Sequence, residues 1–350
     1  MNAVAQKQNV ITLPVQREAP PIDPVEFLIM APQQKREYWY DIARARGFDE
    51  RGFRSGYVGR LRSSLELWVD FVADDIKASG GKTPAEIEAE IIKFPVWADA
   101  LRGAPNEILR HALFAAIQGK TRKMLQEKVV AKTDGCTLYF TGCQLDQSDF
   151  DVWLQLINQA RWEPAETVCT FKAGTFLKSI GRDDGKAQHV WLKSVIDRLS
   201  NSVLTVERDG KRARSQLIVC TARDEVTKAY SVKIERGIAE LYIEGWTGLN
   251  WERRKILRGK PLALWLDGYF ATHAEPGAVK VETIRQRCGS ETGSLRLFRQ
   301  SLRSALDVLQ DVGALASWSI DSTRDVVFVD RGAAISDSQR RHLDRKERSS

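Results

Sequence analysis

The sequence predicts an α+β protein that consists of two tandem winged-helix domains and a helical N-terminal extension. Three observations support this fold class. Near the C-terminus a short helix, a tight turn, a long basic helix and a β-hairpin follow one another. A similar order of helices and hairpin occurs once earlier in the chain, and helical patterns precede both. The two copies show no residue-level repeat, so we interpret the duplication as architectural.

The overall composition favours a multidomain protein with a polyanionic partner. Hydrophobic residues make up 43% of the 350 residues, which suffices for two or three domains with real cores. The net charge is +7, and a basic balance favours polyanions. No apolar run approaches a membrane span and the N-terminus lacks a signal-peptide pattern, so we expect a cytoplasmic protein without membrane contact.

The sequence predicts two segments within the first 94 residues. Residues 1–30 contain four prolines together with Gln and small residues, which indicates a flexible tail. Residues 31–94 contain helical patterns at 35–46 and 58–77, and a Gly-Gly break precedes a third short helix that starts at Thr83. This segment is the expected helical N-terminal extension.

Residues 95–250 are expected to form the first winged-helix domain. Apolar periodicity predicts helices at 106–117, 149–160, 174–180 and 186–199. Alternating patterns and turn residues predict strands at 128–133, 137–141, 167–171, 202–208, 215–221 and 229–235. The segment between the strands 202–208 and 215–221 is basic, so we interpret it as the wing of this domain.

Two surfaces of the first domain are candidate DNA contacts. Helical spacing in 186–199 buries Trp191, Val195 and Leu199 and leaves a polar face exposed. The hairpin that follows carries cations that could track phosphates or enter a minor groove. The candidates on the helix are Lys186, His189 and Lys193, and those on the hairpin are Arg208, Lys211, Arg212 and Arg214.

Residues 251–332 predict the second winged-helix domain, whose first helix starts near Pro261. A short helix at 283–288 precedes a Gly-Ser turn. Ser294 is placed to cap the next helix and Gly313 to end it, with an apolar stripe between them. Strands at 315–320 and 325–329 flank a polar turn and predict a wing. Residues 333–350 are expected to be a polar basic tail.

Arginines dominate the polar face of this long helix. From Arg285 to Arg303 the chain contains five arginines and one acid, Glu291. Such a helix after a tight turn is typical of a major-groove reader, because arginine offers guanine a bidentate match. An ordinary amphipathic helix with a solvated basic face is the alternative. The candidate DNA contacts of this domain are Ser290, Ser294, Arg296, Arg299, Gln300, Arg303 and Arg324.

The residue pattern does not support catalysis or metal binding. The four histidines never pair at i+2 or i+4 with another histidine or a cysteine, and the five cysteines are scattered. These cysteines predict reduced thiols. Paired acids occur only at a predicted helix end and in a loop, which does not suit a two-metal nuclease. We therefore expect no cofactor, no metal and no enzyme such as a relaxase or nuclease.

Several short stretches in collinear order resemble the TrfA-type plasmid replication initiators. They are FPVWADALRGAPNEILRHALF at 94–114, YFTG at 139–142 with Leu145, DVWLQ at 151–155, WE at 251–252, GYFATHAEP at 268–276 and CGS at 288–290. The resemblance covers about residues 94–331. It implies a tandem winged-helix protein that binds directly repeated iterons, opens an adjacent A+T-rich segment and recruits the host initiator and replicative helicase. It also implies that dimers are inactive and limit plasmid copy number.

The resemblance further implies contact with the polymerase sliding clamp. Family members can carry a glutamine-led clamp motif before the conserved tryptophan, where this chain reads EAEIIKF at 88–94 without a glutamine. We therefore do not expect this segment to contact the clamp directly. The residue patterns alone fit a second function equally well, a winged-helix transcriptional repressor without origin-melting activity. Direct repeats beside an A+T-rich tract indicate the initiator, and a palindrome indicates the repressor.

Overall fold

A computed structural model describes residue 34, residues 92–332 apart from 120 and 134, and residue 339. The chain divides into two compact units, residues 1–91 and 92–350. The predicted tail, the predicted helices before residue 92 and most of the basic C-terminal tail lie outside the described residues, as does most of the segment 88–94. Among the described residues, no helix is long and apolar enough to span a membrane.

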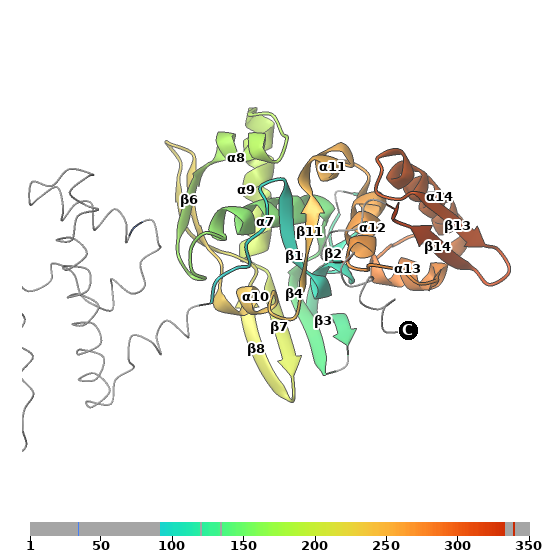
Figure 1. Cartoon of the computed structure of the whole chain (residues 1–350). Coiled ribbons are helices and arrows are strands. Elements are labelled where there is room, and N and C mark those ends of the chain that lie inside the picture. Colours follow the sequence, from blue (N-terminus) through green and yellow to red (C-terminus); the bar gives the residue numbers. More distant parts are fainter. Residues whose placement is uncertain (1–33, 35–91, 120, 134, 333–338, 340–350) are drawn as a thin grey trace, which may run out of the picture. The chain divides into compact units, whose positions relative to one another are not determined.

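The first half of the described region runs from β1 to β11 (Figure 1). The elements are β1 (Leu101–Pro105), α6 (Asn106–Leu109), β2 (Phe114–Ala115), β3 (Met124–Thr133), β4 (Cys136–Cys143), β5 (Leu145–Asp146), α7 (Gln147–Ala160), β6 (Cys169–Lys172), α8 (Ala173–Ser179), α9 (Lys186–Ser200), β7 (Val203–Arg208), β8 (Lys211–Gln216), β9 (Val219–Asp224), β10 (Ala229–Lys233), α10 (Arg236–Glu240) and β11 (Trp246–Asn250).

The second half is smaller and ends the described chain. Its elements are α11 (Trp251–Ile256), α12 (Pro261–Ala271), β12 (Val279–Lys280), α13 (Val281–Arg287), α14 (Leu295–Asp311), β13 (Ser317–Asp321) and β14 (Val326–Asp330). Helices and strands alternate throughout both halves, so the prediction of a mixed fold of helices and strands is confirmed.

One sheet arrangement occurs in both halves. In each half a single strand is followed by two helices and then by a hairpin. The single strand and the hairpin form a three-stranded sheet, in which the single strand pairs with the second strand of the hairpin. The order is β6-β10-β9 around α8 and α9, and β12-β14-β13 around α13 and α14. In the first half the hairpin β7–β8 is inserted after α9 and joins a separate sheet, in the order β3-β4-β7-β8. The duplication of architecture that the sequence suggests is therefore visible in the strand order.

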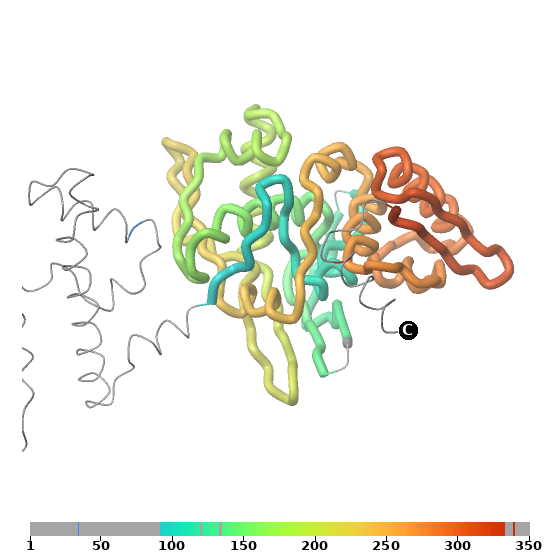
Figure 2. Tube along the Cα trace, viewed as in Figure 1, coloured from blue at the N-terminus to red at the C-terminus, as the bar shows by residue number. Residues whose placement is uncertain are grey.

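The inserted hairpin and its neighbour extend in one direction. The tube in Figure 2 shows β3–β4 and β7–β8 side by side, and β4 and β7 are paired antiparallel. The turn between β7 and β8 consists of Asp209 and Gly210, whose φ angles are 49° and 74°. Two consecutive positive φ angles match the right-handed twist of a two-residue hairpin. The basic residues Lys211 and Arg212 thus lie within β8 and not in the turn.

Local sequence explains where the central helices begin and end. Asp146 caps α7 by accepting hydrogen bonds from the backbone N–H groups of Ser148 and Asp149, while the Asp149 carboxylate accepts from the Asp146 N–H. The end of α14 is also as predicted. Gly313 adopts a φ of 69°, and the N–H of Ala314 donates to the Leu309 carbonyl at 2.8 Å.

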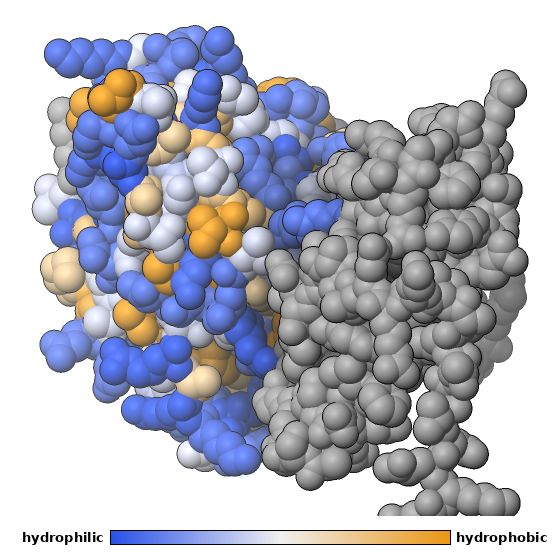
Figure 3. All heavy atoms as spheres, turned by 90° about the vertical axis from the view of Figure 1, so that its left-hand side faces the viewer, coloured by the Kyte–Doolittle hydropathy of each residue, from blue (hydrophilic) through white to orange (hydrophobic). Residues whose placement is uncertain are grey.

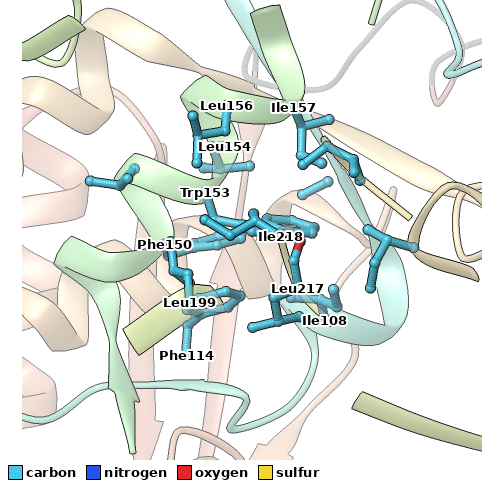
Figure 4. Packing of buried hydrophobic residues seen from close by; sticks show 14 of the residues in the cluster. Ile108, Phe114, Phe150, Trp153, Leu154, Leu156, Ile157, Leu199, Leu217 and Ile218 are labelled. Atoms are coloured by element: carbon cyan, nitrogen blue, oxygen red, sulfur yellow. Dashed lines mark hydrogen bonds between the residues drawn. The ribbon is translucent and has the colours of Figure 1, made fainter. Parts of the chain in front are cut away.

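Two hydrophobic clusters form the core: the larger lies in the first half and also includes Trp251 and Ala271, and the smaller lies in the second half. The larger cluster surrounds Trp153 of α7, where Phe150 stacks on Trp153, and Phe114 stacks on Phe150 and lies tilted against the indole (Figure 4). Trp153 is fully buried, and its indole N–H donates to the Leu217 carbonyl at 3.1 Å. The smaller cluster lies between α12, α13 and α14 and includes Phe298 and Leu302.

Several sequence predictions require correction. The helix predicted at 106–117 is only one turn long, because the chain turns after Leu109 and Phe114 pairs in parallel with Leu145. The strand predicted at 215–221 combines the end of β8 with the start of β9, which belong to different sheets. The buried pair Leu217 and Ile218 forms the corner between them. The strands β1 and β11 and the helix α10 were not predicted.

The two halves are joined by buried polar contacts. Arg254 of α11 is 1% exposed and bonds to the Asp151 carboxylate and to the Gln147 side chain of α7. The indole N–H of Trp265 donates to the His111 carbonyl at 3.1 Å, and the backbone N–H of Ala116 donates to the carbonyl of Cys288 at 2.7 Å. The helices α11, α12 and α13 are therefore held directly against the first half.

Candidate nucleic-acid interface

A tight turn separates α13 from α14. Cys288 ends α13 and Gly289 follows with a φ of 66°. A Cβ added at Gly289 would lie 2.9 Å from the Cβ of Ala115, so only glycine fits both the backbone and the contact. The N–H of Ser290 returns to the Arg285 carbonyl at 3.2 Å, and its hydroxyl bonds to that of Thr292 at 3.2 Å. The predicted turn is therefore confirmed, and its position is fixed by packing.

The start of α14 differs from the prediction in one respect. Ser294 has the extended backbone of an N-cap residue, but its side chain makes no capping hydrogen bond. The side-chain cap is therefore wrong as predicted, although the helix does begin at Leu295. Ser294 is exposed at this end of the helix, whereas Ser290 is half-buried.

The two faces of α14 divide as the sequence predicts. Phe298, Leu302, Leu306 and Leu309 are at most 1% exposed, and Leu295 packs against their cluster. On the polar face Arg296, Gln300 and Arg303 are exposed. Neither Arg296 nor Arg303 forms an ion pair within the part of the chain that the structure describes. The helix thus presents two unpaired arginine charges to solvent beside its apolar face.

Arg299 is placed differently from its neighbours. Its Nε donates to Oδ1 of Asp325 at 2.7 Å and its Nη2 donates to Oδ2 at 2.8 Å. Asp325 lies at the end of the turn between β13 and β14. The side chains are 33% and 30% exposed, so the pair lies at the surface between helix and hairpin. Hydrogen bonds from Arg299 lower the pKa of Asp325, and the pair is ionised at neutral pH.

The β13–β14 hairpin carries the remaining candidate of this half. Asp321 accepts hydrogen bonds from the N–H groups of Thr323 and Arg324, which closes the turn, and from Arg324 Nε at 2.6 Å. The Arg324 side chain is 68% exposed and lies 5.8 Å from the centroid of the Phe328 ring. Arg324 is therefore at the surface, as predicted for a wing residue, and it is paired.

An open groove of about 730 Å³ runs along another side of α14. Gln300 and Ser301 line it from the helix, Ser290 lines it from the turn, and Lys260 lines it from the segment before α12. Sequence reasoning missed Lys260, because it lies 40 positions before Gln300 and no periodic pattern connects the two.

In the first half the candidate helix is α9, and its charges are largely paired. Lys186 is exposed, but Lys193 bonds to Asp197 at 2.7 Å, and His189 pairs with the carboxylate of Asp184. Trp191, predicted to be buried, is half-buried and covered by the Arg182 guanidinium at 3.6 Å from the ring centroid. This helix therefore presents less unpaired positive charge than α14.

The hairpin that corresponds to β13–β14 by strand order is β9–β10 and not β7–β8. Its turn runs from Glu225 to Lys228, Glu225 pairs with Lys228 and with Arg223 of β9, and Val226 is 91% exposed. On the side where β6 lies in Figure 1, hydrophilic residues surround small separate hydrophobic patches (Figure 3). The cations at this tip are paired with Glu225, so the tip offers less free positive charge for phosphate contact than β7–β8. The basic hairpin singled out from the sequence is thus the inserted one.

The four cations predicted on that inserted hairpin are all exposed. Arg208 pairs with Glu244 at 2.9 Å. Arg212 bonds to Glu207 and lies over the ring of Tyr139, 4.7 Å from its centroid. The other two, Lys211 and Arg214, form no ion pair with any residue that the structure describes.

All five cysteines are free, and burial raises the pKa of Cys288 to about 12. Within the described ranges, no group of three or more His, Cys, Asp or Glu side chains is placed to hold a metal ion.

The fold and the exposed cationic helix beside a β-hairpin define a class of protein typical of nucleic-acid binding. Comparison with known proteins identifies the family of this chain. A family model described as TrfA protein matches residues 76–331, and the chain belongs to this family. The TrfA-type resemblance predicted from the sequence is confirmed, and membership agrees with the prediction that the chain is not an enzyme.

One curated relative is the plasmid replication initiator protein TrfA of Escherichia coli, which is 26% identical over 237 residues. The match covers 65% of this chain and 62% of the relative, so it spans less than two thirds of the relative's length. Two crystal structures of domains 2 and 3 of RctB each give a TM-score of 0.43 at 14% identity. They cover 63% and 64% of this chain, and 94% and 96% of their own chains.

Proposed function

We propose that this chain is a plasmid replication initiator. It binds double-stranded DNA at the directly repeated iterons of an origin. The observation that carries the proposal is the exposed arginine face of α14, next to a tight turn and a hairpin, in a chain of the TrfA family. In this proposal two winged-helix domains, residues 95–250 and 251–332, contact the DNA. The repeated strand order and the separate hydrophobic cluster in each half support this division.

The second domain supplies base recognition in this proposal. Its helix α14 enters a major groove, and Arg296, Arg299, Gln300 and Arg303 face the base edges. Ser290 and Ser294 lie near the N-terminal end of the same helix, where hydroxyl groups and backbone N–H groups suit phosphate oxygens. Arg324 on the hairpin contacts the flanking backbone.

The first domain adds contacts of two kinds. Lys186, His189 and Lys193 on α9 meet a second groove, and the last two must exchange their carboxylate partners for DNA. That exchange offsets part of their gain, so this helix contributes less affinity than α14. Arg208, Lys211, Arg212 and Arg214 on the β7–β8 hairpin contact phosphates, which supply affinity but no direct sequence information.

Initiation follows from occupancy of several repeats. Two domains in one chain hold an asymmetric repeat about two major grooves long, so a monomer can bind without a symmetric partner. Several monomers on tandem repeats bend the DNA, and the deformation concentrates at flexible A+T-rich steps. The bound array then recruits the host initiator and the replicative helicase. Dimers that cover the first domain cannot place both domains this way, and they limit copy number.

Footprinting on the DNA that flanks the gene tests the proposal. The expected result is protection of a series of direct repeats beside an A+T-rich tract, and replication of a plasmid carrying these repeats when the protein is supplied in trans. A single protected palindrome, with no replication in trans, would favour the transcriptional repressor instead. That alternative rests on the same helix and hairpin, which transcription factors also use.

A further inference from the structure

The ion pair between Arg299 and Asp325 leaves a defined part of the guanidinium available. An arginine side chain has five N–H donors in a planar fork. Asp325 takes the edge formed by Nε and one hydrogen of Nη2. The opposite edge, formed by Nη1 and the second hydrogen of Nη2, remains. Two parallel donors at one end of a flat group are what guanine O6 and N7 accept.

The backbone holds Asp325 at this place from two sides. Its φ is 53°, a left-handed conformation that Asp and Asn adopt more readily than most residues. Its carbonyl accepts a hydrogen bond from the N–H of Val281, the first residue of α13, at 3.0 Å. The carboxylate is thus tied to α13 through its own backbone and to α14 through Arg299. Hairpin, first helix and reading helix are connected at one residue.

The charge of Arg303 and the state of the pair itself decide the effect of the pair on DNA. Arg303, one turn further along α14, adds positive charge that also favours the ionised Asp325. A free carboxylate near a duplex repels phosphates, but this one is neutralised by Arg299 as long as the pair is intact. If Arg299 changed rotamer, the Asp325 carboxylate would be exposed. Arg299 would at the same time lose the geometry that matches guanine.

We propose that Asp325 is a positioning residue that determines base specificity, because it holds Arg299 with its free edge toward a guanine. This inference rests on the proposed DNA-binding function. The pre-set guanidinium loses less side-chain entropy on binding than a free one. Asp325 also raises the energetic cost of binding any other base. A base pair that offers no guanine acceptors leaves the remaining N–H donors of Arg299 unsatisfied.

Asp325→Asn is the decisive variant. Asparagine tolerates the positive φ but has one acceptor oxygen, and its NH₂ group would face an N–H of Arg299. Binding is measured with the full chain on a random-duplex library, from which the enriched sequence and the preference at each position are read. We expect Arg299→Ala to lose a guanine preference of about tenfold at one position. Asp325→Asn should lose most of the preference at that same position.

Affinity for random-sequence DNA should move in the opposite direction. Removing one negative charge from the surface should tighten binding to a scrambled duplex by about twofold at low salt. A purely structural role would weaken both kinds of binding. Arg299→Lys keeps the charge but lacks the fork, so it should behave like Arg299→Ala in base preference while its salt dependence is unchanged.

Asp321→Asn is the matched control. It removes one charge from the same hairpin but touches Arg324 and not Arg299. It should tighten non-specific binding to the same extent and leave every base preference unchanged. Thermal unfolding of each variant verifies the fold.

The outcomes separate two failures. A wild-type protein that enriches no sequence would overturn the proposed function and this inference together. Specific wild-type binding with an unchanged guanine preference in Asp325→Asn, or in Arg299→Ala, would overturn the inference alone.

Discussion

Replacing Arg254 with methionine tests how the two halves are held together. Arg254 is 1% exposed, and its guanidinium bonds to the Asp151 carboxylate and, at 2.9 Å, to the side-chain oxygen of Gln147. It also lies over the Phe150 ring, 4.8 Å from the centroid. Methionine fills a similar space but donates no hydrogen bond, so the Asp151 charge loses its partner.

The expected loss follows from the burial of this pair. Removing one partner of a buried ion pair costs about 3–5 kcal/mol. The Asp151 side chain is 18% exposed, so water relieves part of the penalty and we expect about 3 kcal/mol. The control is Arg258→Met, because Arg258 is exposed and donates to the Ile180 carbonyl at 3.3 Å. It should cost about 1 kcal/mol or less.

Urea unfolding followed by tryptophan fluorescence measures both variants. Burial raises the pKa of Asp151, and Arg254 opposes that rise. Loss of Arg254 therefore raises the folded-state pKa further above the unfolded value, which destabilises the fold at every pH above the unfolded value. The deficit of Arg254→Met should shrink as pH falls from neutral toward about 4. Equal losses in the two variants, or a deficit that grows in acid, would refute the reasoning.

Two further predictions concern DNA contact and pH. Joint replacement of Lys211, Arg212 and Arg214 by alanine should weaken specific and non-specific binding alike. It should also flatten the slope of log K against log[salt] by about 0.9 for each phosphate that is no longer neutralised. An altered base preference at an unchanged slope would contradict this prediction. Burial lowers the pKa of His111 and of His273, so near pH 6.5 the folded chain binds fewer protons at these sites than the unfolded chain. The free energy of unfolding should therefore fall as pH drops below about 6.5, and replacing both histidines with glutamine should reduce that fall; an identical pH profile would refute it.

The sequence predicted elements whose signals are local. The helix α14 was defined by a glycine that ends it and by an apolar stripe, and both features lie within the helix or next to it. Elements that depend on distant partners were missed. β1 pairs with β11, about 145 positions later, and its sequence LRGAP has little strand propensity of its own. The helix predicted at 106–117 failed because the same apolar spacing also suits a turn that buries Leu113 and Phe114.

The candidate site was predictable to a similar extent. Helical periodicity identified the exposed face of α14, but not which arginine is paired. The partner of Arg299 lies 26 positions away, in the hairpin turn, and no spacing rule connects them. In the first half, the basic composition of the β7–β8 hairpin suggested a wing. The strand order instead assigns the equivalent position to β9–β10, which only the pairing of β6 with β10 reveals.

Reactivity of unpaired thymines to permanganate tests origin opening most directly. The purified protein and the host initiator are added to supercoiled DNA that carries the direct repeats and the adjacent A+T-rich tract. If the chain is an initiator, thymines in the tract become reactive when the repeats are occupied, because bending energy is released at weakly stacked steps. Occupied repeats without reactive thymines, together with no replication in trans, would contradict the initiator function and leave a DNA-binding repressor.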